Sequence, residues 1–576
     1  ITAFLAKILP VSFEDLIFYL PVVFSSFIVV PILLLSSHLR QIPAGFIAAL
    51  VASIGVSYYN RTMAGYYDTD MLNIILPLMM VWSLSLALQT KAPRYMLFTG
   101  LEIVFYRWWY PQSYSLEFAF FGLILLYVLW KKRDSAYHYQ LLALMLIAMM
   151  GLPDLMRLFG VLIVFGIFLR TSAHPKIWLG FAFAAFLFTG GFNPIWAQLK
   201  GYVFRDEILT TKEDVSLHFY TVMQTIREAT HIPFETFAMR ISGHWSLFLA
   251  SMVGFVLLVR AHPVTLLMLP MLGLGFLAYV GGLRFTVYAV PIAAFGLGFV
   301  IMELARWLEN RFSKERNIKL MAKVFILTAT FVALYPNIAH IVNYRVPTVM
   351  NAQEVAQLEA FGSVTSQKDY TLGWWDYGYP IRYYANTQTL IDGGLHEGDA
   401  NFPVSYSFFS DQASASNMAK FAVYYHAKRR EIALKEKELE KDKRTIIPST
   451  NIAWMMETLG YTNSNEFLKD LPHLNPPLYE DDIYIYLPFK MISILQTIGR
   501  FSMLDLMDGS PTGEPFIFFA TNTKDGEHVL ELAPNAHVDK RNGTITINNI
   551  TTHLNKSIST SYDNSGNLTK KVQPLH

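Results

Sequence analysis

The sequence predicts a polytopic α-helical membrane domain followed by a mixed α/β domain on the outer side of the membrane. Of the 576 residues, 53% are hydrophobic and only 16% are charged, well below the roughly 25% charged that is usual in soluble proteins. Apolar stretches of helix length recur over residues 16–339, separated by short charged or proline-bearing breaks. The composition then becomes mixed. We therefore expect a transmembrane domain over 1–339 and a soluble domain over 340–576.

The hydropathy rule gives about twelve candidate spans within the first domain. They lie near residues 16–35, 42–58, 71–88, 95–107, 113–130, 137–152, 155–169, 177–192, 245–259, 264–280, 285–304 and 320–339. Several are short, so neighbouring stretches could be two parts of one span.

Lysine and arginine near the span ends orient these helices, because positive charge stays on the cytoplasmic side. One connection carries Lys131, Lys132 and Arg133, and a second basic cluster occupies residues 306–319. Counting spans alternately from either anchor gives the same orientation. It places the connections 59–70, 193–244 and 281–284 outside, together with the whole soluble domain.

Composition also excludes several classes of function. The net charge of +2 gives no strongly basic surface, so no nucleic-acid partner is expected. The absence of cysteine excludes disulfides, thiolate catalysis and zinc–sulfur sites. We find no phosphate-binding loop, dinucleotide fingerprint or His-Glu-x-x-His motif. Chemistry on the outer face cannot draw on cytoplasmic nucleotide, and an activated substrate carried by the membrane, such as a lipid pyrophosphate, fits that constraint.

An aromatic stretch in the soluble domain, Gly373 to Pro380, reads Gly-Trp-Trp-Asp-Tyr-Gly-Tyr-Pro. Indole N–H groups only donate hydrogen bonds and a carboxylate only accepts them, so Trp374, Trp375 and Asp376 could bracket a hydroxyl from both directions. Taken alone, the stretch is more simply explained as an aromatic turn that caps the core of a soluble domain.

Acidic residues gather on the predicted outer side. Asp68 and Asp70 lie at the outer mouth of a span, where two acids are costly unless they bind something. Such acids supply the oxygen ligands that Mg²⁺ or Mn²⁺ prefers. Glu228, in the long loop 193–244, is a third carboxylate that could reach the same cation. The alternative is a set of solvated surface acids.

Two arginines and an apolar pair complete the candidate residues. Arg240 and Arg284 lie at outer span ends, where they could pair anionic groups bidentately or simply extend toward the membrane interface. Met491 and Ile494 share one face if their segment is helical. Residues 515–560 alternate in a strand-like way, and Asn-Gly at 542–543 predicts a hairpin.

Four motifs in this order resemble the bacterial oligosaccharyltransferases of the PglB type, which are related to the catalytic subunit of the eukaryotic enzyme. The resemblance covers essentially the whole chain. It is carried by Trp374-Trp375-Asp376-Tyr377-Gly378, the paired-acid motif Tyr67-Asp68-Thr69-Asp70, Thr225-Ile226-Arg227-Glu228 as Thr-Ile-x-Glu, and Met491 to Ile494 as Met-x-x-Ile.

The resemblance implies a membrane domain of the GT-C glycosyltransferase type in the bacterial inner membrane, with its active site facing the periplasm. The implied reaction transfers a glycan from a polyprenyl pyrophosphate in the membrane lipid to the asparagine amide of Asn-x-Ser/Thr. Mg²⁺ or Mn²⁺ is the implied cofactor.

The resemblance also assigns roles to residues. It implies that Asp68 and Glu228 bind the metal with Asp70 close by, and that Glu228 contacts the acceptor amide. Trp374, Trp375 and Asp376 are implied to bind the acceptor hydroxyl, with Met491 and Ile494 lining that site. Arg240 is implied to pair an acidic residue two positions before the acceptor asparagine, and Arg284 to meet the pyrophosphate.

One departure from the family leaves alternatives open. The family has a further metal-binding Asp in its first outer loop, whereas this chain begins at Ile1, after that point. We expect the natural protein to be longer, and one alternative is an inactive fragment. Another is a polyprenyl-dependent glycosyltransferase with a non-protein acceptor. A transporter ranks low, because its charges would lie near the middle of the membrane.

Overall fold

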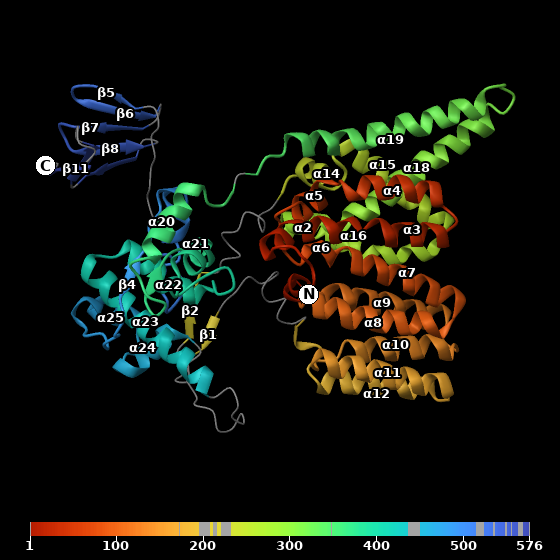
Figure 1. Cartoon of the computed structure of the whole chain (residues 1–576), viewed down its shortest axis with the longest axis horizontal. Coiled ribbons are helices and arrows are strands. Elements are labelled where there is room, and N and C mark those ends of the chain that lie inside the picture. The colour runs from red at the N-terminus through yellow and green to blue at the C-terminus, as the bar shows by residue number, and fades with distance from the viewer. Residues whose placement is uncertain are drawn as a thin grey trace. The chain divides into compact units, whose positions relative to one another are not determined.

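The computed structural model of the chain (Figure 1) divides into two compact units. Unit 1 comprises Ile1–Glu207 and Thr221–Val355, and unit 2 comprises Ile208–Tyr220 and Ala356–His576. Part of the predicted outer loop 193–244 therefore belongs to unit 2. The predicted domain ranges, as statements about membrane topology, remain predictions. The structure describes residues 2–171, 173–194, 208–210, 216–220, 232–346, 348–435, 450–513, 523–533, 536–547, 550–554, 556–562 and 568–574.

Unit 1 consists of helices that run roughly parallel to one another (Figure 1). Helical segments occupy each of the twelve predicted stretches. They are α1 (Thr2–Ile8), α2 (Phe13–Ser26), α3 (Val29–His38), α4 (Ile42–Ser53), α5 (Val56–Thr62), α6 (Asp70–Asn73), α7 (Ile75–Thr90), α8 (Pro93–Trp109), α9 (Tyr114–Lys131), α10 (Ala136–Ala148), α11 (Asp154–Arg170), α12 (Pro175–Phe188), α14 (Phe234–Ser242), α15 (Trp245–Ala261), η4 (Pro263–Met268), α16 (Leu269–Phe276), α17 (Ala278–Gly281), η5 (Leu283–Ala289), α18 (Val290–Arg311) and α19 (Ile318–Asn343).

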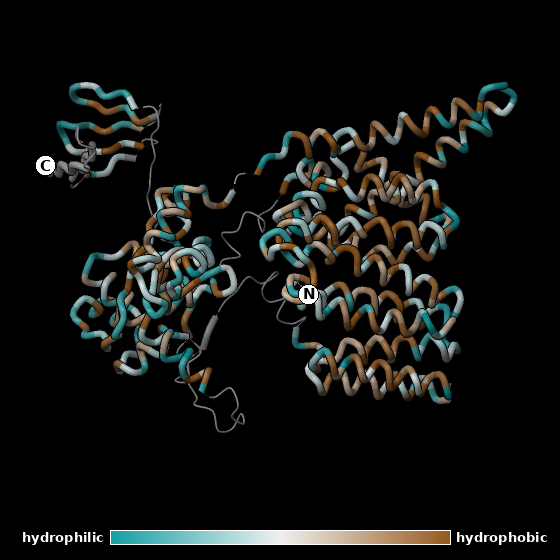
Figure 2. Tube along the Cα trace, in the orientation of Figure 1, coloured by the Kyte–Doolittle hydropathy of each residue, from teal (hydrophilic) through white to brown (hydrophobic). Residues whose placement is uncertain are grey.

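Several of these helices are long and apolar enough to cross a membrane. Within the described ranges there are five, or up to seven if each bent pair counts as one span. Figure 2 shows hydrophobic residues along the helices of unit 1 and hydrophilic residues gathered near many helix ends. The five are Phe13–His38, Asp70–Thr90, Tyr114–Lys131, Leu283–Arg311 and Ile318–Asn343, and the bent pairs are α4 with α5 and α14 with α15. The expectation of a multi-pass membrane protein is confirmed.

Glycines allow α18 to lie very close to its neighbours. A Cβ atom built on Gly254 of α15 would lie 1.9 Å from the carbonyl oxygen of Gly296 in α18. A Cβ on Gly298 would lie 2.2 Å from the carbonyl oxygen of Ala44 in α4. Small residues at these crossings let backbones approach, which is how helices associate where lipid supplies little hydrophobic driving force. This packing holds α18 against α4 and α15, and the segment directly before α18, η5, contributes residues to the candidate site.

Unit 2 contains both helices and strands, which confirms the predicted mixed class. Strands β3 (Tyr370–Leu372) and β4 (Ile483–Ile485) pair in parallel. The helical elements are α20 (Ala352–Gly362, across the boundary of the units), α21 (Trp375–Pro380), the π-helical turn η6 (Ile381–Ala385), α22 (Gly398–Phe409), α23 (Gln412–Lys435), α24 (Asn451–Leu459), α25 (Ser464–Asp470), η8 (Leu471–His473), η9 (Phe489–Ile494) and α26 (Leu495–Gly499).

The other strands of unit 2 form antiparallel sheets. Strands β1 (Ile208–Thr210) and β2 (Ser216–His218) pair with each other. A five-stranded sheet has the order β5–β6–β7–β8–β9, and β10 pairs with β11. Their bounds are β5 (Lys524–Asp525), β6 (Val529–Ala533), β7 (Ala536–Asp539), β8 (Thr544–Ile547), β9 (Ile550–His553), β10 (Lys556–Tyr562) and β11 (Leu568–Pro574).

The hairpin predicted at Asn542-Gly543 is confirmed between β7 and β8. Asp539 pairs with Thr544, so the turn contains four residues. Gly543 adopts a φ of 60°, a left-handed conformation that glycine tolerates without steric cost. The Asp539 carboxylate accepts hydrogen bonds from the backbone N–H groups of Arg541 and Asn542, which holds the turn.

Unit 2 should lose stability in mild acid because of His426 on α23. Burial, reinforced by Arg430 and Arg429, lowers the pKa of His426 from its ordinary 6.5 to about 4. Between pH 6.5 and about 4, the unfolded chain therefore binds a proton at His426 that the folded chain does not bind. The free energy of unfolding consequently keeps its full value above pH 6.5 and falls as the pH drops toward 4. The loss is of order 3 kcal/mol. Thermal unfolding across this range should show a smaller acid effect for His426→Gln. The variant His473→Gln, at an exposed histidine, should show the same loss of thermal stability with falling pH as the wild type. If His426→Gln also showed the wild-type loss, His426 would not be the cause of the acid effect.

Candidate functional site

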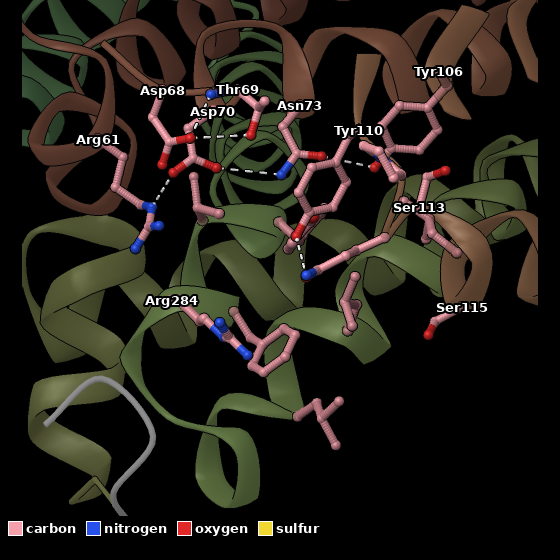
Figure 3. A pocket seen from close by; sticks show the side chains of 18 residues that line it. Arg61, Asp68, Thr69, Asp70, Asn73, Tyr106, Tyr110, Ser113, Ser115 and Arg284 are labelled. Atoms are coloured by element: carbon pink, nitrogen blue, oxygen red, sulfur yellow. Dashed lines mark hydrogen bonds and ion pairs between the residues drawn. The ribbon is translucent and has the colours of Figure 1, made fainter. Parts of the chain in front are cut away.

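Unit 1 contains a cavity of about 420 Å³ in which the predicted residues Asp68, Asp70 and Arg284 meet (Figure 3). Its lining comes from segments far apart in the sequence. The lining residues are Arg61, Asp68, Thr69, Asp70, Asn73, Tyr106, Tyr110, Pro111, Gln112, Ser113, Ser115, Leu116, Leu274, Leu277, Arg284, Phe285, Val287 and Tyr288.

Asp68 lies two residues before the start of α6 and points into this cavity (Figure 3). Its Oδ1 accepts hydrogen bonds from the Thr69 backbone N–H at 2.6 Å and the Thr69 hydroxyl at 3.2 Å. Asp68 and Thr69 also line a second cavity, of about 370 Å³, together with Met71, Trp108 and Trp109. Asp68 therefore lies at the junction of two cavities, and the second of them is rich in aromatic side chains.

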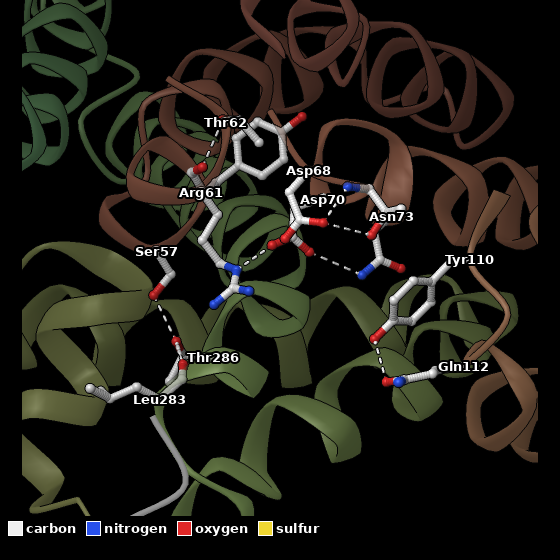
Figure 4. Close-up of polar contacts among 12 residues, drawn as sticks. Ser57, Arg61, Thr62, Asp68, Asp70, Asn73, Tyr110, Gln112, Leu283 and Thr286 are labelled. Carbon is white, nitrogen blue, oxygen red and sulfur yellow. Dashed lines mark hydrogen bonds and ion pairs between the residues drawn. The ribbon is translucent and has the colours of Figure 1, made fainter. Parts of the chain in front are cut away.

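Asp70 is the first residue of α6 and is buried. It forms an ion pair with Arg61 of α5, and its Oδ1 accepts a hydrogen bond from the Asn73 amide at 3.3 Å (Figure 4). Asn73 in turn accepts from the Tyr106 hydroxyl at 2.9 Å. Because Asp70 already has a cationic partner and an amide donor, its orientation is fixed more firmly than that of Asp68.

Arg284 contributes positive charge to the cavity that holds the two acids. It stands near the start of η5, just after Gly282, whose φ of 93° is readily adopted only by glycine. The guanidinium lies over the Phe285 ring at 5.3 Å from its centroid. The cavity thus presents two carboxylates together with the guanidinium groups of Arg61 and Arg284, an arrangement that suits an anion bridged to the acids by a cation.

A buried ion pair holds the wall of the cavity formed by residues 110–113. Arg107, near the end of α8, pairs with Glu117 in the first turn of α9, and both side chains are almost inaccessible to solvent. The Ser113 hydroxyl donates to Glu117 Oε1 at 2.6 Å, and Arg107 Nη1 donates to the Met149 carbonyl at 2.7 Å. The pair therefore joins the two helices on either side of the turn that lines the cavity.

The cavity lies at the end of the helices opposite to the basic clusters. Helices α7, α9 and α18 all begin beside it, since Asn73, Ser113 and Tyr288 are among its lining residues. Their far ends carry Lys91, Lys131 and Arg311. Helix α9 alone spans about 27 Å, close to the thickness of the hydrocarbon core.

Arg240 lies elsewhere in unit 1. Its Nη1 donates to the buried Asn60 side-chain oxygen at 2.8 Å, while the Asn60 amide donates to His340 Nε2 at 2.7 Å. These contacts join α14 to α5 and α19. Arg240 is not part of the lining of the cavity that contains Asp68 and Arg284.

In unit 2, parallel strands bring the two motifs predicted to bind the acceptor to one sheet edge. Strand β3 ends at Leu372, directly before Gly373 and Trp374, and β4 ends at Ile485, shortly before η9 with Met491. The Tyr486 N–H donates to the Leu372 carbonyl at 2.8 Å, which extends the pairing to the motif itself. Ligand sites commonly form at the carboxyl ends of parallel strands.

The two tryptophans are held by ring contacts. Trp374, 3% exposed, meets Phe501 edge to face at 5.1 Å, and Trp375 stacks on His396 at 4.9 Å with 25° between the rings. Within the described part of the chain, neither indole N–H donates a hydrogen bond to the protein. Both donors therefore remain available to a ligand, as the hydroxyl-binding prediction requires.

Asp376 lies in the first turn of α21, and its side chain reaches solvent. Surrounding protein nevertheless removes part of its hydration, which raises the pKa of its carboxyl; its own backbone N–H and His396 act in the opposite direction. Met491 is 1% exposed in η9, and Ile494, at the end of the same turn, is half-buried. The predicted apolar pair therefore lies on one short 3-10 helix.

Asp68, Asp70 and Arg284 share one cavity, while Arg240 lies apart. Glu228 lies outside the described residues, and no group of three potential metal-binding side chains occurs among those described. Sequence reasoning missed four neighbours of the site: Arg61, Asn73, His396 and Phe501. Only Asn73, at helical i+3 spacing from Asp70, had a local signal.

Comparisons with known proteins agree on one family. The profile "Oligosaccharyl transferase STT3, N-terminal" matches residues 1–342, and "STT3/PglB/AglB core domain" matches residues 367–508. The undecaprenyl-diphosphooligosaccharide–protein glycotransferase of Campylobacter jejuni is 37% identical over 543 residues, covering 92% of this chain and 74% of that protein.

More distant relatives are archaeal. The dolichyl-phosphooligosaccharide-protein glycotransferase of Methanococcus voltae is 22% identical, covering 59% of this chain and 37% of that protein. The fold is similar to the Archaeoglobus fulgidus oligosaccharyltransferase tethered to an acceptor peptide with the NVT sequon, with a TM-score of 0.51 and 15% identity over 73% of this chain and 59% of that one. By the two profiles and the Campylobacter relative, this chain belongs to the STT3/PglB family of oligosaccharyltransferases.

Proposed function

We propose that this protein transfers a glycan from a polyprenyl diphosphate carrier, undecaprenyl diphosphate by similarity to its Campylobacter relative, to the side-chain amide of asparagine in Asn-x-Ser/Thr. The observation that carries the proposal is the position of Asp68 at the junction of two cavities in a chain of this family. A lipid-borne donor and a peptide acceptor must reach one reaction centre from different directions. A carboxylate shared by two cavities suits that requirement.

The donor's diphosphate is assigned to the larger cavity. Arg284 and Arg61 supply guanidinium groups, which bind phosphate oxygens in a planar, bidentate way. Tyr110 lines the same wall, and its hydroxyl donates to the Gln112 side chain at 3.3 Å. These groups would hold the diphosphate beside the acids, so that its bond to the sugar faces Asp68.

A divalent cation, Mg²⁺ or Mn²⁺, is the proposed cofactor. Asp68 and Asp70 offer the hard carboxylate oxygens that such ions prefer, and both line the cavity. Glu228 is proposed as a further ligand. Asp68 is the more open of the two described acids, because Asp70 is engaged by Arg61 and Asn73. A cation held there supplies Lewis-acid stabilisation to the departing diphosphate.

The acceptor amide needs activation, because its nitrogen lone pair is conjugated with the carbonyl. The peptide rotational barrier of about 18–20 kcal/mol measures such conjugation. Carboxylates that accept both amide N–H groups, for which we propose Asp68 and Glu228, would hold the group twisted and free the lone pair. Trp374, Trp375 and Asp376 would fix the peptide by its hydroxyl, with Met491 and Ile494 beside it. Arg240 is proposed to pair an acidic residue two positions before the asparagine.

We place the reaction on the periplasmic side of the bacterial inner membrane. Support comes from the basic residues Lys91, Lys131 and Arg311, which end the helices that begin at the cavity. Positive charge stays in the cytoplasm, so the cavity end faces outward.

The test is to incubate the purified protein with lipid-linked oligosaccharide and an Asp-x-Asn-x-Thr peptide, and to identify the product by mass. We expect a glycopeptide whose formation stops on chelation of divalent cations and resumes when Mg²⁺ or Mn²⁺ is restored. Transfer to a lipid or sugar acceptor without any glycopeptide would favour the alternative of a glycosyltransferase with a non-protein acceptor.

Acceptor binding should weaken in acid because of Asp376. Only the ionised carboxylate accepts a hydrogen bond on both oxygens, and burial raises the pKa of this group from its ordinary 3.8. Protonation should therefore raise the acceptor KM at a pH above that of an ordinary aspartate. His396→Gln should move the midpoint higher still, because His396 lowers the pKa of Asp376. The measurement is acceptor kcat/KM across the acidic range. Asp376→Asn should lack this transition, and its persistence in that variant would contradict the prediction.

A further inference from the structure

A short segment of the predicted outer loop, residues 216–220, belongs to unit 2 and packs against the rest of that unit. The His218 N–H donates to the Leu506 carbonyl at 2.8 Å, and β2 pairs with β1. The side chains of Leu217 and Phe219 are buried, and the Phe219 ring meets Phe402 edge to face at 6.3 Å. The segment is therefore fixed by a backbone hydrogen bond and by apolar burial together.

The last residue of this segment begins a line of three aromatic rings that ends in the acceptor motif. The Tyr220 ring meets Phe501 edge to face, with centroids 5.3 Å apart and 80° between the planes. Phe501 meets Trp374 in the same way, at 5.1 Å and 64°. Edge-to-face geometry is the favoured arrangement of aromatic pairs, because the positive ring edge meets the negative ring face.

Phe501 is the central member of this line and is itself well fixed. It is 1% exposed, and its N–H donates to the Ile498 carbonyl at 3.1 Å. The same carbonyl accepts from the Ser405 hydroxyl at 2.6 Å. Phe501 therefore packs against the Trp374 ring from a position that is fixed by α22 and by the outer-loop segment.

We propose that Phe501, supported by Tyr220, is a positioning residue that holds the Trp374 indole in the orientation needed to recognise the acceptor hydroxyl. The inference rests on the proposed acceptor-binding role of Trp374. A tryptophan side chain rotates about two torsions, and each rotation carries its N–H away from a bound hydroxyl. A ring locked by neighbours keeps the donor in place before the acceptor arrives, which lowers the entropy lost on binding.

A purely structural role for these rings makes a different prediction. If Tyr220 and Phe501 only stabilise the fold, their loss lowers the fraction of active protein. That fraction cancels in the ratio of kcat/KM for two acceptors measured on one preparation. The ratio of an Asn-x-Thr peptide to its Asn-x-Val isostere therefore reports the hydroxyl-binding geometry alone.

The experiment measures this ratio for the full chain with lipid-linked donor, in the wild type, Tyr220→Ala and Phe501→Leu. We expect the ratio to fall by about tenfold to 10²-fold in both variants, because small displacements in a preorganised site have effects of that size. Tyr220→Phe keeps the ring, so its ratio of kcat/KM for the threonine and valine peptides should stay close to that of the wild type. Tyr220→Leu keeps apolar bulk without the ring, so it should lower the ratio even if Tyr220→Ala fails to fold.

Tyr461→Ala is the matched control. Tyr461 meets the buried Phe467 edge to face at 5.6 Å and 63°, also in unit 2. Its loss removes a similar contact without touching the line to Trp374, so its ratio should equal that of the wild type. If Phe501→Leu and Tyr220→Leu kept the wild-type ratio while Trp374→Ala lost it, the positioning role would be wrong and the acceptor-binding role of Trp374 would stand. A wild-type ratio in Trp374→Ala would instead overturn the acceptor-binding role on which it rests.

Discussion

An acceptor peptide in which valine replaces the threonine of Asn-x-Thr should be used roughly 10⁴-fold less efficiently than its parent, as kcat/KM. Valine has nearly the shape of threonine, so the loss comes from the hydroxyl. Without it, the indole N–H groups of Trp374 and Trp375 and the carboxylate of Asp376 would lose the shared partner that we propose for them. Groups built to hydrogen-bond a substrate are costly when left unpaired.

Variants of the residues proposed to bind the hydroxyl should reduce the difference in kcat/KM between the threonine and valine peptides. Asp376→Ala removes the hydrogen-bond acceptor, and Trp374→Phe removes one donor while keeping an aromatic ring. Both should lower kcat/KM for the threonine peptide and leave that for the valine peptide nearly unchanged. Peptide kinetics with the two acceptors measures this directly. Equal losses for both peptides would show that these residues do not read the hydroxyl. Serine should be only slightly poorer than threonine, since one methyl group is worth up to about 0.8 kcal/mol.

Asp68→Asn should lower glycan transfer by about 10²-fold or more. The change removes the negative charge and keeps the size of the side chain. Stabilisation of a leaving diphosphate by a bound cation is worth several kcal/mol, and each 1.36 kcal/mol is a factor of ten in rate. The variant should also need more Mn²⁺ for half-maximal activity. Glu228→Gln should act in the same direction if it is a further ligand.

Asp15→Asn provides the control for this measurement. Asp15 is an exposed acid in the first turn of α2, where it accepts a hydrogen bond from Ser12 at 2.7 Å. It lines neither cavity that contains Asp68. Its replacement should change neither the rate nor the metal requirement. A wild-type rate with an unchanged Mn²⁺ dependence in Asp68→Asn would remove this residue from the metal site.

The helical half of the fold could be predicted from composition and apolar length, because lipid requires both over every span. The bends could not. Helices α4 and α5 meet at 55°, and α14 and α15 at 70°. The second break coincides with Gly243 at a φ of 78°, but glycine also occurs inside uninterrupted helices, such as Gly122 in α9. Hydropathy records which residues face lipid and says little about where a helix turns.

The candidate site was partly predictable for a related reason. Asp68, Asp70 and Arg284 all fall at span ends that the sequence predicts to lie outside, so a count of spans was enough to predict that they share one side. Their partners depend on contacts between distant segments. Arg61 reaches Asp70 across a loop, and Phe501 reaches Trp374 across more than a hundred residues. Neither pairing leaves a periodic or local pattern in the sequence.

The pairing of β3 with β4 determines where the sequence can tolerate insertions and deletions. The Trp374 motif and the Met491 turn are separated by a long run of chain, yet two short paired strands set their relative position. Insertions or deletions within the intervening helices leave that relation intact. A single residue added between Leu372 and Trp374, or between Ile485 and Met491, would shift one motif against the other. Length variation among descendants should therefore accumulate between the strands and avoid those two junctions.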